Sequence, residues 1–202
     1  GGGSGGGGGG RNGMMRGATG YTEGKHFWTM KTVVFNNSGS GYHFVGIATA
    51  DAANEFSDSQ CGSEAWGIYL NGNYKCHGGS GGKSSYGNVS LSRDNTTLGI
   101  FLDLEDDDGL GSLSFYALPN GESKWRPQGK CYTKLRESLP EGAGTAIFPA
   151  IAAGCLELNE YRFDFDPAEL PEELQSVELG SASSAAGGAT SWSKGNDGQV
   201  EL

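Results

Sequence analysis

Short runs in which apolar and polar residues alternate recur along this chain, separated by turns rich in Gly, Asn and Asp. Along Phe27–Phe35 the even-numbered residues, from Trp28 to Val34, carry no charge, whereas the odd-numbered residues include Lys31. Successive side chains of a strand point to opposite faces, so these two sets would lie on opposite sides of a sheet. The pattern predicts a strand whose uncharged face is buried.

Six further runs show strand patterns, and no helical repeat of apolar residues extends over ten positions before Pro167. These runs are Tyr42–Thr49, Ala65–Leu70, Leu98–Leu104, Ser112–Leu118, Ile147–Ala153 and Cys155–Phe165. Asn71-Gly72 is a strong hairpin turn. In the last run the apolar positions change from even to odd, which predicts a bulge near Asn159-Glu160. Many short strands joined by Gly-rich turns favour an all-β fold, an antiparallel β-sandwich.

The same pattern names the residues expected to fill the space between the two sheets. They are Trp28, Val34, Val45, Ile47, Ile100, Leu102, Leu113, Phe115 and Phe163.

The composition divides the chain into three parts. Residues 1–11 form a Gly-rich linker, because glycine has no side chain to bury. Residues 12–167 are long enough for one domain with a proper core. Residues 168–202 form a tail, with a short helix near 167–175 and then disorder, because few large apolar side chains offset the entropy of ordering. The chain does not begin with Met, so it is interpreted as a fragment, and its glycines as a natural or a cloning linker.

Charge and cysteine content exclude several function classes. The chain carries 24 acidic and 14 basic residues, a net charge of −10, and has no Lys/Arg cluster, which argues against nucleic acid and membrane partners. No run of 18 apolar residues occurs. The spacing of Cys61, Cys76, Cys131 and Cys155 matches no zinc pattern, and the cysteines are interpreted as mostly free thiols of an intracellular, cytoplasmic or nuclear protein.

Three motifs are candidate sites for chemistry, and each departs from its pattern. A phosphate loop at Gly78–Ser84 fails, because the pattern requires a glycine where His77 stands. The acidic run Asp103–Asp108 lacks the glycine and glutamate of a calcium loop and is predicted to be a solvated hairpin tip. Carboxylates two residues apart, such as Asp164 and Asp166, fit the spacing of a glycosidase pair but lack an aromatic sugar platform. We therefore predict no enzyme activity, no cofactor and no metal site.

Five segments, in order, resemble the SPRY domain family. They are RGATGYTEGKHFW (Arg16–Trp28), YHFVGIATA (Tyr42–Ala50), AWGIYLNGNYKCHGG (Ala65–Gly79), LGIFLDLEDDDGLGSLSFYALPNGE (Leu98–Glu122) and IFPAIAAG (Ile147–Gly154). The resemblance covers most of residues 12–167. Thr29 stands where the family usually has a glutamate. The family fold is a concanavalin A-like jelly roll, so the resemblance agrees with the strand pattern.

The resemblance also implies a function and a site. SPRY domains bind a partner protein or peptide, without catalysis, through loops at one edge of the sandwich, often within a larger adaptor or scaffold protein. The corresponding positions here are Gly41, Tyr42, Phe56, Asp58, Ser59, Gln60, Ala153 and Gly154. No Trp accompanies Ala153 and Gly154, so the peptide preference of other members does not carry over. The domain is expected to be monomeric. A carbohydrate-binding or glycan-cleaving sandwich stays the alternative.

Overall fold

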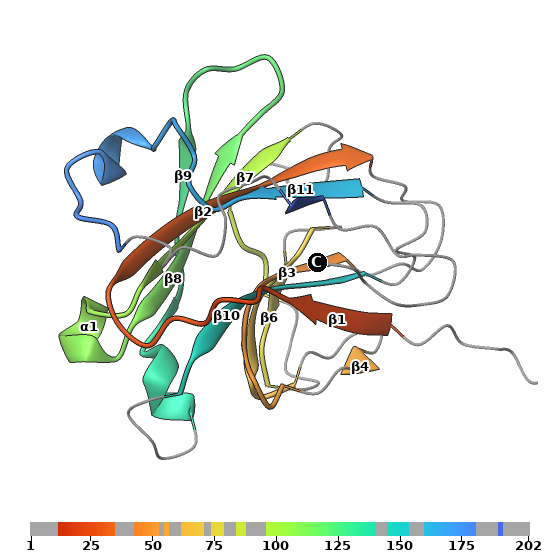
Figure 1. The fold of residues 1–202 in the computed structure, drawn as a ribbon, viewed down its shortest axis with the longest axis vertical. Coiled ribbons are helices and arrows are strands. Elements are labelled where there is room, and N and C mark those ends of the chain that lie inside the picture. Colours follow the sequence, from red (N-terminus) through yellow and green to blue (C-terminus); the bar gives the residue numbers. More distant parts are fainter. Residues whose placement is uncertain are drawn as a thin grey trace, which may run out of the picture.

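The computed structural model describes residues 12–34, 43–52, 55–56, 62–70, 74–78, 84–87, 96–139, 145–153, 160–180 and 190–191. Its strands form two layers that face each other (Figure 1). All strand pairs within both layers are antiparallel. The antiparallel β-sandwich predicted from the sequence is confirmed.

Each layer is a six-stranded sheet. Sheet 1 has the order β4 (Glu55–Phe56), β1 (Asn12–Arg16), β10 (Ile147–Ala153), β3 (His43–Thr49), β5 (Ala65–Tyr69) and β6 (Tyr74–Cys76). Sheet 2 has the order β12 (Thr190–Ser191), β11 (Glu160–Asp164), β2 (Lys25–Val34), β7 (Thr97–Asp103), β8 (Ser112–Leu118) and β9 (Arg126–Thr133). The short helices are α1 (Asp106–Gly109), η1 (Leu135–Ser138) and η3 (Glu172–Leu174).

Side chains from the inner faces of both sheets make one core. All the predicted core residues whose side chains the structure describes are at most 3% exposed: Trp28, Val45, Ile47, Ile100, Leu102, Leu113, Phe115 and Phe163. Val34 ends β2, and its side chain lies outside the described part. Alternation along the central strands therefore identified the core correctly, because one face of each strand points to the other sheet.

Two irregularities of sheet 2 follow from its sequence. The pairing of β11 with β2 shifts register between Glu160 and Tyr161, so the predicted bulge is confirmed. The acidic run leads from the end of β7 into the single helical turn α1 at the tip of the β7–β8 hairpin. There Asp103 Oδ1 accepts the backbone N–H groups of Glu105 and Asp106, each at 3.0 Å. Lys25 Nζ, on the neighbouring strand β2, lies 3.7 Å from Asp103 Oδ2. Both oxygens of this carboxylate therefore have partners within the hairpin and β2.

The outer face of sheet 2 is covered by the C-terminal segment, residues 167–180. Leu174, 3% exposed, packs with Phe27 and Tyr116, and three half-buried residues surround them: Leu170, Val177 and Leu179. Figure 1 shows this segment outside the layer that holds β2 and β8. Phe27 is therefore buried although its face of β2 also carries Lys31, and the sequence expectation of a single buried face was incomplete.

The tail was expected to be disordered beyond its short helix. Of the part after residue 180, the structure describes Thr190–Ser191, which pair with Phe163 and Arg162 as β12. Two residues of the tail thus extend sheet 2 next to β11. The remaining tail residues and the Gly-rich linker lie outside the described residues.

Lys75 closes one open side of the sandwich, between the edge strands β6 and β9. Its Nζ donates a hydrogen bond to the carbonyl of Cys131 at 2.6 Å. The ammonium group lies 5.5 Å from the ring centre of Tyr86 and 5.6 Å from that of Tyr132, within the range of cation–π attraction. Tyr132 also donates its hydroxyl to the carbonyl of Gly67 at 3.1 Å. The two sheets are thereby joined at this edge.

The cysteine interpretation needs a correction. Cys76 is disulfide-bonded, whereas the four cysteines were predicted to be mostly free thiols. Cys131 is free and buried, as expected. Spacing alone did not indicate the bond, because disulfide partners are brought together by the fold. Within the described ranges, no helix has both the length and the apolar character needed to cross a membrane.

Candidate functional site

The predicted partner-binding residues come from three separate stretches of the chain. The structure describes the backbone of two of them, Phe56 in β4 and Ala153 in β10. The other six lie outside the described residues: Gly41, Tyr42, Asp58, Ser59, Gln60 and Gly154. The site therefore stays a prediction, and its geometry can be judged from the strand ends that lead into it.

Sheet 1 brings these strand ends together. Phe56 of β4 pairs with Asn12, the first residue of β1. Two residues further along, Met14 pairs with Ala152 of β10, and the next residue of β10, Ala153, pairs with His43 at the start of β3. Four strands thus begin or end side by side. We call this end of sheet 1, which holds Asn12, His43, Phe56 and Ala153, the loop end.

A buried pair of side chains joins the two sheets beneath the loop end. His43, 1% exposed, lies on the same face of β3 as Val45 and Ile47, and its Nδ1 is hydrogen-bonded to the hydroxyl of Tyr161 on β11. Burial lowers the pKa of His43 to about 4 and raises that of Tyr161. His43 is therefore neutral at physiological pH and serves the architecture. The sequence indicated a strand histidine, but its partner is 118 positions away.

The other two histidines are also held by their surroundings. The ring of His26 stacks on Tyr21 at 3.8 Å, and its Nε2 lies 2.7 Å from the carbonyl of Glu23. The ring of His77 stacks on Trp66 at 4.9 Å, and its Nδ1 lies 3.0 Å from the carbonyl of Ala65. Each ring thus packs on an aromatic neighbour and is hydrogen-bonded to a backbone carbonyl.

The free thiol of Cys131 and the carboxylate of Asp164 are likewise accounted for by the fold. Burial raises the pKa of the Cys131 thiol to about 12, with the Lys75 ammonium acting in the opposite direction, so the thiol is protonated at neutral pH. Asp164 Oδ1 accepts the backbone N–H of Asp166 at 3.0 Å and closes a local turn. No three His, Cys, Asp or Glu side chains of the described ranges lie close enough to hold a metal ion.

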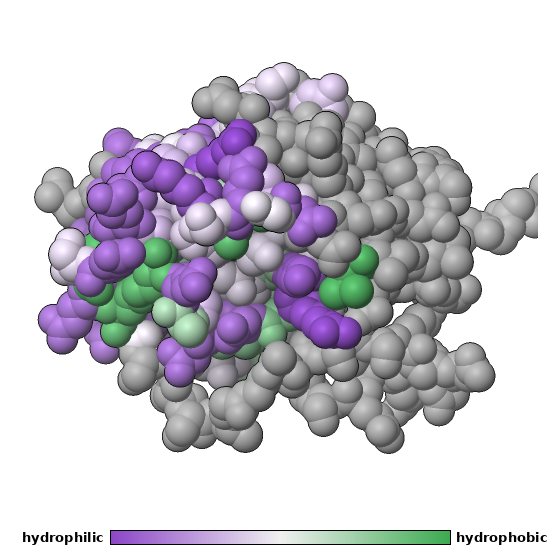
Figure 2. All heavy atoms as spheres, turned by 90° about the horizontal axis from the view of Figure 1, so that it is seen from above, coloured by the Kyte–Doolittle hydropathy of each residue, from purple (hydrophilic) through white to green (hydrophobic). Residues whose placement is uncertain are grey.

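Trp125 packs onto the outer face of sheet 2. Its ring meets that of Phe27 edge to face, with 5.9 Å between the ring centres, and the side chain is half-buried. Seen from above, the described surface is mainly hydrophilic, and hydrophobic residues gather in small separate patches (Figure 2). The described part of that face therefore shows no broad hydrophobic patch of the kind that marks an apolar docking surface.

Comparisons with known proteins define the class of fold. No protein-family model and no curated protein matches the chain. The SPRY domain of human HERC1 matches with a TM-score of 0.52 and 20% sequence identity, over 71% of this chain and 75% of that one. A second human SPRY domain has a TM-score of 0.44 and 10% identity, over 72% and 80%. The Emp47p carbohydrate recognition domain has a TM-score of 0.33 and 12% identity, over 75% and 71%.

The chain therefore has the fold of a SPRY domain. This conclusion rests on the match to the HERC1 SPRY domain alone, whose TM-score is 0.52. The resemblance seen in the sequence is confirmed at the level of the fold.

Proposed function

We propose that this chain is a non-catalytic interaction module that binds a partner protein or peptide through the loop end, as a monomeric domain of a larger adaptor or scaffold protein. The SPRY fold is the observation that carries the proposal. The convergence of four strand ends at Asn12, His43, Phe56 and Ala153 supports it, because loops that leave a rigid scaffold together can form one binding surface. The proposed contact residues are Gly41, Tyr42, Phe56, Asp58, Ser59, Gln60, Ala153 and Gly154.

Replacing both Tyr42 and Phe56 with Ala is expected to lower the affinity for the partner at least about 30-fold, because aromatic anchors dominate such interfaces. The 202-residue chain first captures the partner, which mass spectrometry identifies. Calorimetry then measures the affinity of the purified partner for the wild type and the double variant. Tyr74→Ala, in the edge strand β6 on the opposite side of sheet 1, is the matched control and should bind normally.

Two outcomes separate the site from the function. Normal binding by the double variant would remove the site assignment and leave the interaction module standing. Saturable binding on a glycan array, with no protein captured, would favour the carbohydrate-binding alternative instead. A folded double variant with native circular dichroism is required for either comparison.

We further propose that the domain acts inside the cell, in the cytoplasm or nucleus. The free thiol of Cys131 is compatible with a reducing compartment, whereas the disulfide at Cys76 is typical of an oxidising one. The acceptor sequences at Asn36, Asn88 and Asn95 allow a direct test, because N-glycosylation occurs in the secretory pathway. Protein isolated from its native cells is expected to keep its mass after N-glycosidase treatment. A loss of mass would place the domain in the secretory pathway.

A further inference from the structure

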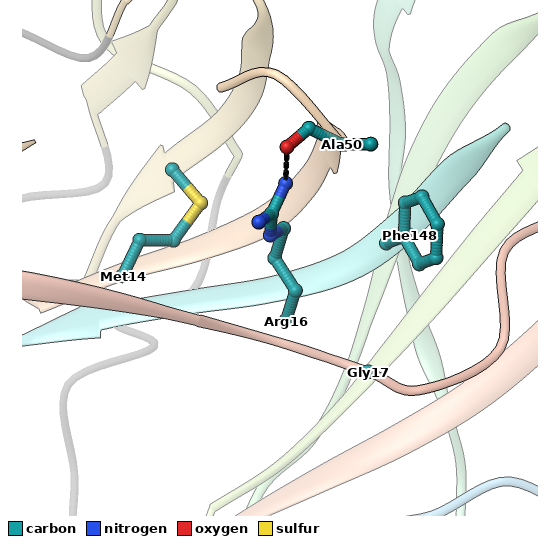
Figure 3. Close-up of a pocket in the computed structure, with 5 residues that line it drawn as sticks. All are labelled: Met14, Arg16, Gly17, Ala50 and Phe148. Atoms are coloured by element: carbon teal, nitrogen blue, oxygen red, sulfur yellow. Dashed lines mark hydrogen bonds between the residues drawn. The ribbon is translucent and has the colours of Figure 1, made fainter. Parts of the chain in front are cut away.

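A pocket of about 370 Å³ lies at the other end of β1 from the loop end, on the outer face of sheet 1. Five residues line it: Met14, Arg16, Gly17, Ala50 and Phe148 (Figure 3). Arg16 lies four residues beyond Asn12, or about 13 Å along an extended strand. The pocket is thus separate from the proposed loop-end site, and ligand binding in it does not depend on the proposed function.

The backbone of neighbouring segments sets the shape of the pocket. The N–H of Gly17 donates to the carbonyl of Pro149 at 2.8 Å, which holds the end of β1 against β10. A Cβ atom on Gly20 would lie 2.6 Å from Cζ of Phe148, so the ring occupies space that only glycine leaves open. Phe148 therefore stands as one apolar wall, and Met14 supplies another.

Arg16 presents an unused edge of its guanidinium group. Its Nη1 donates to the carbonyl oxygens of Thr49, at 2.7 Å, and Ala50, as Figure 3 shows for Ala50. Its Nε and Nη2 donate to no residue in the described part of the chain, and the side chain makes no ion pair there. Nε and Nη2 together form one side of the guanidinium fork, whose spacing matches the two oxygens of a carboxylate.

We infer that the Arg16 pocket binds a carboxylate carried on an apolar stem, such as the acidic side chain or the C-terminal carboxyl group of a peptide. The fixed Nη1 leaves the Nε–Nη2 edge as the polar contact, and Met14 and Phe148 provide the apolar one. The chain's net charge of −10 repels anions at longer range, and it penalises a dianion such as phosphate more than a monocarboxylate. Affinity must therefore come from both the fork and the apolar walls.

The test is a titration of the 15N-labelled 202-residue chain with hexanoate, monitored by NMR. Hexanoate is expected to shift the backbone N–H signals of Gly17 and Ala50 and the Nε–H signal of Arg16 saturably. Hexanamide, which has the same length but no charge, should bind with an affinity at least roughly 10-fold lower, because hydrogen bonds to charged groups are stronger than those between neutral groups. Inorganic phosphate should produce no saturable shift at these signals. Equal binding of hexanoate and hexanamide would overturn the inference.

Two peptide probes distinguish the sources of the carboxylate. One is N-acetyl-Phe-Leu with a free C-terminal carboxyl group, and the other is N-acetyl-Glu-Leu-amide, whose only carboxylate is a side chain. The probe that shifts the same three signals at lower concentration identifies the source. If neither probe nor hexanoate shifts them, the pocket binds no carboxylate.

Variants complete the test. Arg16→Gln should abolish the preference for hexanoate over hexanamide, whereas Arg126→Gln, an exposed arginine on β9, should keep it. Because Arg16 also holds two carbonyl groups, Phe148→Ala provides a variant with the guanidinium intact. This variant should lower the affinity for hexanoate several-fold. It should leave the affinity for acetate unchanged, because acetate is too short to reach the apolar wall. Retention of the full preference in folded Arg16→Gln contradicts the inference.

Discussion

Replacing Leu102 with Ala is expected to lower the free energy of unfolding by about 2–5 kcal/mol. Leu102 is fully buried and lies in β7, where it pairs with His26 of β2 on one side and Leu113 of β8 on the other. Its neighbours belong to central strands that cannot collapse into the vacated space without moving a sheet. The loss therefore combines the transfer free energy of the deleted atoms with the cost of a cavity.

Urea denaturation, monitored by tryptophan fluorescence and circular dichroism, measures this loss. Leu118→Ala is the matched control, because Leu118 ends β8 and is half-buried. This control should cost about 1 kcal/mol or less, as is usual away from the core. Equal losses for the two variants would mean that the space between the sheets is not the main core.

The central strands could be predicted from the sequence because their buried face requires apolar residues at alternate positions. In β7, Leu98, Ile100 and Leu102 alternate with Gly99 and Phe101, and the first three are the residues buried between the sheets. The bulge in β11 was predictable for the same reason, since a change of parity must be absorbed by an extra residue.

The edge strand β9 shows no such alternation of apolar residues. In β9, Arg126–Thr133, the only fully buried residue is Cys131, and Pro127 and Gly129 interrupt the strand. The sequence pattern therefore predicted no strand there. Its partners are supplied by β8, through hydrogen bonds that the backbone makes whatever the side chains are, so periodicity could not find it.

The outer face of sheet 2 and the Arg16 pocket depend on contacts across long sequence distances. Phe27 is buried by Leu174, which lies almost the whole domain further along the chain. Arg16 meets Ala50 and Phe148 only after β1, β3 and β10 have paired. The loop-end residues, in contrast, were proposed from the resemblance to SPRY domains. The strand register then supplies what the sequence could not, the common end at which Phe56 and Ala153 lie.

Lowering the pH from about 7.5 to about 5 is expected to reduce the free energy of unfolding by about 2 kcal/mol through His43 alone. His43 lies between the sheets, and burial lowers its pKa from 6.5 to about 4. In the unfolded chain this imidazole takes up a proton below about pH 6.5, whereas in the folded domain it stays neutral until about pH 4. Its contribution is fully present above pH 6.5 and is lost, at up to about 1.4 kcal/mol per pH unit, as the pH falls towards 4.

Urea denaturation of the wild type and of His43→Gln across this pH range isolates the effect. Glutamine can still hydrogen-bond to the hydroxyl of Tyr161 but does not titrate, so the variant should lose about 2 kcal/mol less than the wild type between pH 7.5 and 5. All other groups are the same in both proteins, so their contributions cancel in the difference. If His43→Gln keeps the wild-type pH dependence, the His43–Tyr161 pair is not buried beneath the loop end as described.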